Sequence, residues 1–117
     1  MRYFEDFTVG EEAEFGRYEM TRDEIIEFAE KYDPQPCHLS EERAKGTLFG
    51  GFCASGWHTW AATMRMMVEE MKARDTGGLG SPGVDEIRWL RPVFPGDILR
   101  VKTKVLGTRP SKSRPQI

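Results

Sequence analysis

The chain has 117 residues, of which 38% are apolar, enough for the core of one domain that we expect to span residues 1–117. A net charge of −2 gives no reason to expect nucleic acid as a partner, and no apolar run reaches the roughly 20 residues of a membrane helix. The first six residues also lack the apolar run of a secretory signal.

The first half of the chain predicts one strand followed by helices. Residues 12–20 alternate as a strand does. Three of their side chains would share one face: Ala13, Phe15 and Arg17. The run Thr-Arg-Asp-Glu at 21–24 is a capping box, and the apolar spacing after it predicts an amphipathic helix that Pro34 ends near Tyr32. Ser40 then caps a further short helix.

A long helix is predicted over residues 53–74. Its apolar positions recur at spacings of three and four: Ala54, Trp57, Ala61, Met64, Val68 and Met71. No charged residue occurs in this segment up to Met64, so we expect the helix to be buried on most sides.

The last part of the chain predicts two more strands, over residues 84–90 and 98–106, separated by a turn at Pro95-Gly96. In the second strand, four side chains would share one face: Leu99, Val101, Thr103 and Val105. Strands around one apolar helix indicate an α+β fold with a curved antiparallel sheet. Because three strands are few for so apolar a helix, we expect the domain to be incomplete at its C-terminal end, or completed by a partner.

The two cysteines, Cys37 and Cys53, stand in unlike contexts without metal-ligand spacing. This pattern favours reduced thiols in the cytoplasm, while a disulfide between them is an alternative that the sequence leaves open. Two histidines and no cluster of cysteine with histidine along the chain predict no metal site. His58, on the apolar helix, is interpreted as a packing residue with one hydrogen bond.

The run from Asp33 to His38 places a carboxylate and an imidazole on a loop that two prolines stiffen. It resembles the Asp-x-Asn-Pro-x-His motif of the MaoC-like dehydratases, a group with the hot-dog fold that includes the (R)-specific enoyl-CoA hydratases. Gly56 falls where that family has a His-Gly pair opening its central helix. Two positions depart from the pattern, since the family's Asn is Gln35 here and its His is Ser55.

The resemblance implies reversible hydration of a 2-enoyl-CoA. Asp33 and His38 would be the catalytic pair, and the Gly56 amide would stabilise the thioester oxygen. Four further residues are expected to contact the substrate: Gln35, Ser55, Trp57 and Trp60. Burial near the apolar helix predicts a raised pKa for Asp33. No cofactor is implied beyond the coenzyme A of the substrate, and a homodimer is expected.

Each residue of this set also has a simpler interpretation. Asp33 could end a helix before a proline, His38 could be a surface residue before a helix cap, and Gly56 could only permit close packing. Their joint occurrence in order favours the hydratase. The alternatives are a hot-dog thioesterase, which would be expected to carry an acid on the central helix, and a non-catalytic module that binds acyl-CoA.

Overall fold

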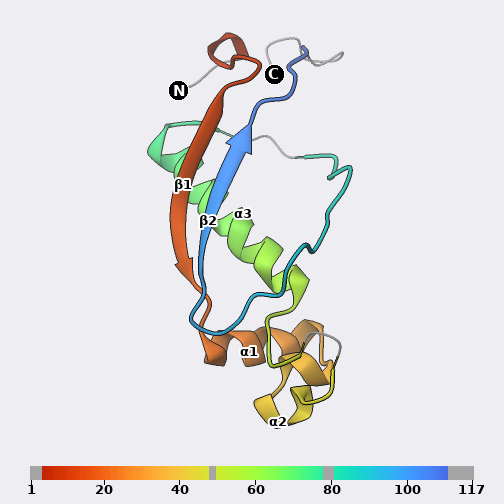
Figure 1. Ribbon diagram of the computed structural model, residues 1–117. Helices are drawn as coiled ribbons and strands as arrows, with labels where there is room; N and C mark the ends of the chain where they lie inside the picture. Colours follow the sequence, from red (N-terminus) through yellow and green to blue (C-terminus); the bar gives the residue numbers. More distant parts are fainter. Residues whose placement is uncertain (1–3, 48–49, 78–80, 111–117) are drawn as a thin grey trace.

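A long helix packs against one face of a two-stranded antiparallel sheet, and two shorter helices, Arg22–Tyr32 and Glu41–Ala44, lie near its N-terminal end (Figure 1). The computed structural model describes residues 4–47, 50–77 and 81–110. In chain order the elements are η1 (Phe4–Asp6), β1 (Glu12–Glu19), α1 (Arg22–Tyr32), η2 (Pro36–His38), α2 (Glu41–Ala44), α3 (Gly56–Ala73) and β2 (Ile98–Lys104). This is the expected α+β arrangement of a long helix on an antiparallel sheet.

The sheet pairs β1 with β2, and a bulge in β1 corrects one predicted orientation. Gly16 and Arg17 together oppose a single residue of β2, so the alternation shifts and Tyr18, not Arg17, turns inward. Gly16 has a φ of +83°, and a Cβ there would lie 2.7 Å from Sδ of Met66 on α3. A glycine therefore lets the bulge form and lets the helix approach the strand closely.

The predicted caps position the helices that precede α3. The Thr21 hydroxyl accepts a hydrogen bond from the Glu24 amide at 3.3 Å, and the Ser40 hydroxyl accepts one from the Arg43 amide at 3.1 Å. α1 ends at Tyr32 as expected from Pro34. Thr21 and Ser40 therefore fix where α1 and α2 begin, while Pro34 limits where α1 ends and so where the loop of the candidate site starts.

α3 is shorter at its start and less covered than predicted. It begins at Gly56 because residues 53–55 are extended and are held by neighbouring loops. Its buried side chains are His58, Ala62 and Met66, one per turn. Four members of the predicted stripe are exposed: Trp57, Ala61, Met64 and Val68. The expectation of a helix buried on most sides is wrong for the described residues, because two strands cover only one face.

The predicted strand over residues 84–90 is absent. This segment is extended but joins no ladder within the described part of the chain, so its backbone lacks the neighbour that would make it a strand. The turn at Pro95-Gly96 is confirmed, with Gly96 at a φ of +89° and its amide 2.7 Å from the Met20 carbonyl. β2 follows with Leu99, Val101 and Thr103 inward, as predicted.

The main buried cluster lies where α1, η2 and the segment before α3 meet. Its members are Met20, Ile25, Cys37, Ala44, Phe52, Cys53 and Ala54. The loop that carries Asp33 and His38 rests on this cluster, so packing holds its backbone in place. No helix in the described ranges combines the length and the apolarity that crossing a bilayer requires.

Candidate active site

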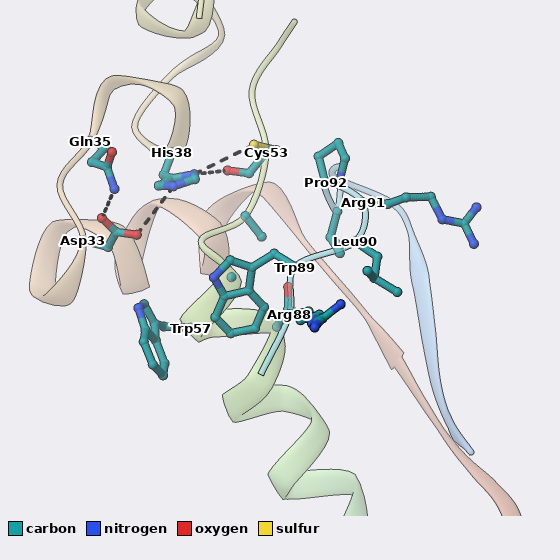
Figure 2. A pocket seen from close by; sticks show the side chains of 14 residues that line it. Asp33, Gln35, His38, Cys53, Trp57, Arg88, Trp89, Leu90, Arg91 and Pro92 are labelled. Carbon is teal, nitrogen blue, oxygen red and sulfur yellow. Dashed lines mark hydrogen bonds and ion pairs between the residues drawn. The ribbon is translucent and has the colours of Figure 1, made fainter. Parts of the chain in front are cut away.

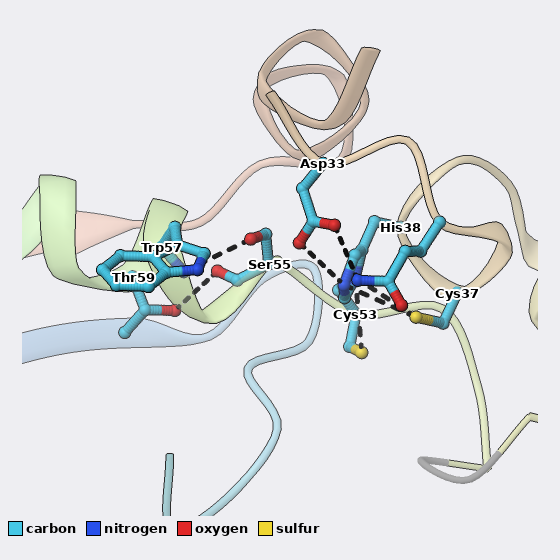
Figure 3. A network of polar contacts seen from close by, with 8 residues as sticks. Asp33, Cys37, His38, Cys53, Ser55, Trp57 and Thr59 are labelled. Atoms are coloured by element: carbon cyan, nitrogen blue, oxygen red, sulfur yellow. Dashed lines mark hydrogen bonds and ion pairs between the residues drawn. The ribbon is translucent and has the colours of Figure 1, made fainter. Parts of the chain in front are cut away.

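The fold brings Asp33 and His38 together at the edge of the core. Asp33 caps the C-terminus of α1, and η2 then returns the chain so that His38 Nε2 lies 3.5 Å from Asp33 Oδ2 (Figure 3). The His38 side chain is 6% exposed and that of Asp33 is 17% exposed. The expected acid and imidazole therefore face each other at a site that is largely screened from bulk water.

One hydrogen bond decides which His38 nitrogen carries the proton. Nδ1 lies 2.7 Å from the Cys53 carbonyl oxygen, which only accepts. Nδ1 is therefore the donor, and in the neutral ring the lone pair is on Nε2, the atom that faces Asp33. The backbone thus fixes both the tautomer and the direction of the ring.

Asp33 is held as an anion, contrary to the sequence-based expectation. Burial by itself raises its pKa, but hydrogen bonds from Gln35 and Ser55 and the nearby His38 outweigh burial, so the net pKa is lowered. Gln35 Nε2 donates to Asp33 Oδ1 at 2.6 Å. The expectation of a raised pKa is wrong because polar side chains donate hydrogen bonds to the carboxylate and stabilise its charge, whereas the prediction assumed an apolar environment.

Gly56 is the first residue of α3, and Ser55 caps the helix by accepting from the Trp57 amide at 3.2 Å. The Gly56 amide donates no hydrogen bond to another residue in the described ranges. Trp89 lies so close over this glycine that a Cβ at position 56 would sit 2.5 Å from the indole ring. The ring also meets Trp57 edge to face, with centroids 5.4 Å apart.

A pocket of about 540 Å³ opens in front of these groups (Figure 2). Its walls come from the Asp33 loop, the start of α3 and the segment before β2: Asp33, Gln35, His38, Cys53, Ala54, Gly56, Trp57, Thr59 and residues 88–93. Of the residues expected to contact substrate, Gln35 and Trp57 line it. Ser55 lies buried beneath it, and Trp60 is on another part of α3, outside the lining.

Several lining residues were not among the predicted site residues, and three of them carry large or charged side chains: Arg88, Trp89 and Arg91. Arg88 and Trp89 belong to the segment 84–90 that was predicted as a strand, where alternation indicates only which side chains share a face, and Arg91 begins the bend after it. Nothing in that pattern signals that Trp89 would fold over Gly56. The glycine at position 56 is the feature of the sequence that suggests close packing there, and it does not identify Trp89 as the neighbour.

The two cysteines lie beside His38 as free, buried thiols, so the disulfide alternative is not formed here. Burial raises the pKa of Cys53 to about 11 and raises that of Cys37 as well. The two sulfurs and a His38 ring nitrogen all lie within 4.8 Å of one another. The fold therefore creates a possible ligand set that the spacing along the chain did not indicate.

His58 packs as expected but lacks the predicted hydrogen bond at one nitrogen. Its ring stacks on Phe28 with centroids 4.8 Å apart. Nδ1 is buried without a hydrogen-bond partner among the described residues. Burial lowers the pKa of this imidazole, which keeps it neutral and apolar in behaviour.

The MaoC like domain matches residues 6–116. A 3-hydroxybutyryl-CoA dehydratase from Methylorubrum extorquens is 31% identical, over 98% of this chain and 71% of the relative. A solved MaoC-like dehydratase from Rhodospirillum rubrum is 43% identical with a TM-score of 0.80, covering 98% of this chain and 77% of its own. The R-hydratase PhaJ1 from Pseudomonas aeruginosa is 27% identical with a TM-score of 0.63, covering 90% and 65%.

These likenesses agree with the geometry described above. The two solved neighbours have the hot-dog fold, which confirms the predicted fold class. The relatives are hydratases and dehydratases, which places this chain among enzymes of that broad kind. Since the family match extends over nearly all of its length, the chain belongs to the MaoC-like domain family.

Proposed function

We propose that this protein is a hydro-lyase that reversibly hydrates a 2-enoyl-CoA to the 3-hydroxyacyl thioester. The observation that carries the proposal is the convergence of three groups on one pocket. His38 Nε2 lies 3.5 Å from Asp33 Oδ2, and both residues line the same pocket as Gly56. A base, an oriented carboxylate and a backbone donor are the groups that addition of water to a conjugated thioester needs.

Asp33 and His38 would share one water molecule. The Asp33 carboxylate orients it, and His38 Nε2 accepts its proton as the oxygen bonds to C3. The pair then returns a proton to C2, so the net change is addition of one water across the double bond. No electrons are transferred, so the proposed reaction requires no redox cofactor. Proton transfer by a positioned group of this kind is typically worth about 100–10,000-fold in rate.

Gly56 would stabilise the negative charge that develops on the thioester oxygen. Its amide is at the N-terminus of an 18-residue helix, where the helix dipole adds positive potential. Loss of one such donor typically costs on the order of 100–1,000-fold in rate. Because the Ser55 hydroxyl engages the Trp57 amide instead, the Gly56 amide is left available for substrate.

Gln35, which replaces the Asn of the family motif, still contacts the proposed catalytic carboxylate. The amide of Gln35 donates to Asp33 Oδ1 at 2.6 Å, so the residue in the Asn position contacts the carboxylate directly. This contact supports a working site in spite of the substitution. Ser55, in the family's His position, is buried as a helix cap and does not face the pocket. Its side-chain hydrogen bond to Asp33 helps to lower the pKa of that carboxylate.

The pocket suits a short acyl group on coenzyme A. Trp57 and Trp89 form apolar walls close to Gly56, and two indole rings on the acyl side would limit the length of the acyl chain. Arg88 and Arg91, at the same pocket, offer charges for the phosphates of coenzyme A. We also propose a homodimer, since exposed apolar side chains on α3 such as Met64 and Val68 would be covered by a second copy.

The experiment supplies purified protein with crotonyl-CoA and follows two products. Loss of the conjugated enoyl absorbance measures hydration, and reaction of free thiol with a thiol reagent measures release of coenzyme A. We expect hydration without thiol release. Faster release than hydration would favour the thioesterase, although α3 carries no acidic residue before Glu69. Binding with neither reaction would favour the non-catalytic acyl-CoA module.

A further inference from the structure

Three soft donor atoms meet behind the pocket wall. They are Cys37 Sγ, Cys53 Sγ and a ring nitrogen of His38, and all lie within 4.8 Å of one another. The three residues are each at least 94% buried. Within the described ranges, Cys37, His38 and Cys53 form the one group of three or more possible metal ligands. Thiolate and imidazole are the donors that Zn²⁺ and similar thiophilic ions prefer.

The backbone holds these donors in place before any ligand arrives. The Cys53 amide donates to the Cys37 carbonyl at 2.9 Å, which ties the η2 loop to the segment before α3. His38 Nδ1 donates to the Cys53 carbonyl at 2.7 Å, which fixes the ring. A site whose ligands are already gathered and rigid loses little conformational freedom on binding.

The distances approach those of a tetrahedral site. Cys37 Sγ lies 3.5 Å from both ring nitrogens of His38, including Nε2, the nitrogen with the free lone pair. Bonds of about 2.3 Å to sulfur and 2.0–2.1 Å to nitrogen give a ligand-to-ligand separation of roughly 3.5 Å in a tetrahedron. Cys53 Sγ lies 3.9 Å from Nδ1, so its side chain must turn toward Nε2 for both sulfurs to bind one ion.

A fourth ligand is available from the pocket side. Asp33 Oδ2 is 3.5 Å from His38 Nε2, and a carboxylate oxygen is an ordinary zinc ligand. As the metal binds, each thiol gives its proton to solvent and its sulfur bonds to the ion. The two thiolates balance the charge of a divalent cation, and the Asp33 carboxylate, at the more accessible pocket side, adds one negative charge.

We propose that Cys37, His38 and Cys53 form a binding site for a thiophilic divalent metal ion, with Zn²⁺ as the fitting ion. Binding takes the Nε2 lone pair of His38, so the metal-bound protein cannot use that nitrogen as a base. The site is therefore an inhibitory one that competes with the proposed hydration. Only this last consequence rests on the proposed function, because binding itself can be measured without any substrate.

The test titrates the reduced protein with Co²⁺ and then displaces it with Zn²⁺. Cobalt bound by thiolates gives a ligand-to-metal charge-transfer band, and the chain has only these two cysteines to produce it. We expect one ion per chain. Cys37→Ser and Cys53→Ser should each weaken binding by at least about 100-fold, which exceeds the 10–100-fold typical of an outer-shell partner. The double variant should give no band.

The two histidines supply a matched pair of controls. His38→Gln should weaken Co²⁺ binding, whereas His58→Gln, at the other histidine of the chain, should leave the binding unchanged. Circular dichroism of each variant without metal checks that it is folded. Absence of the band in folded wild-type protein, or equal binding by His38→Gln and wild type, would overturn the proposal. Because these readouts need no substrate, a protein that binds metal but hydrates nothing refutes only the proposed function.

Discussion

Gly56→Ala should reveal whether Trp89 really covers the start of α3. The new Cβ would lie 2.5 Å from Cδ2 and Cε2 of the indole and 2.9 Å from its Nε1. Because carbon atoms pack at about 3.5 Å, the ring must retreat by about 1 Å. Its 49% exposure leaves it a solvent side toward which to move. We therefore expect strain without collapse of the fold.

The size of the effect follows from two opposing contributions. Overpacking typically costs about 1–3 kcal/mol, and a half-exposed ring favours the lower end of that range. Alanine is a better helix residue than glycine by about 0.5–1 kcal/mol, which offsets part of the loss. The net expectation is a decrease in the free energy of unfolding of about 0.5 kcal/mol. In a Trp89→Ala background the clash is gone, so the same substitution should be neutral or stabilising.

Urea unfolding followed by far-ultraviolet circular dichroism measures all four proteins of this double-mutant cycle. Gly107→Ala serves as the matched control, since a Cβ there meets open space and its φ lies outside the left-handed region. The reasoning is refuted when Gly56→Ala has the same effect with and without Trp89. That result would mean that the indole does not lie on Gly56 in solution.

Two further predictions concern substrate size and alkaline pH. Trp89→Ala should raise kcat/KM for a 2-octenoyl-CoA relative to crotonyl-CoA by on the order of tenfold, since pocket volume discriminates added methylenes at roughly this level. An equal loss with both substrates would contradict the role of the indole as a limit on chain length. Burial, followed by the hydrogen bond with Glu24, raises the pKa of Tyr18 from 10.0 to about 12. Its contribution to stability is therefore present below pH 10 and is lost as the pH rises through about 12, so Tyr18→Phe should flatten this part of the stability curve measured by urea unfolding. A curve of unchanged slope would count against that assignment.

Short-range signals in the sequence predicted the helix caps, the end of α1 and the proximity of Asp33 and His38. Thr21 and Ser40 cap the helices by local hydrogen bonds, and Pro34 stops α1 by sterics that any neighbouring structure must respect. Asp33 and His38 are separated by a short, proline-stiffened loop, so their proximity follows from the chain itself. Such features need no knowledge of distant contacts.

The features that the sequence did not reveal depend on distant contacts. The bulge that turns Tyr18 inward in place of Arg17 arises where β1 meets β2. The buried face of α3 is set by which side the two strands cover, so periodicity alone chose a neighbouring stripe. The pKa of Asp33 is lowered in part by Ser55, 22 positions away (55 − 33 = 22). Trp89 over Gly56 is likewise a tertiary contact that no local pattern encodes.

Hydration of crotonyl-CoA by wild type, Asp33→Asn and His38→Gln tests the central claim most directly. Both substitutions preserve side-chain size while removing the carboxylate or the base, so the fold should persist. We predict measurable hydration by wild type and a decrease in kcat of about 100–10,000-fold in each variant. The double variant should be little worse than either single one, because the two groups act as a unit. Hydration by either variant within a few-fold of wild type would contradict the account.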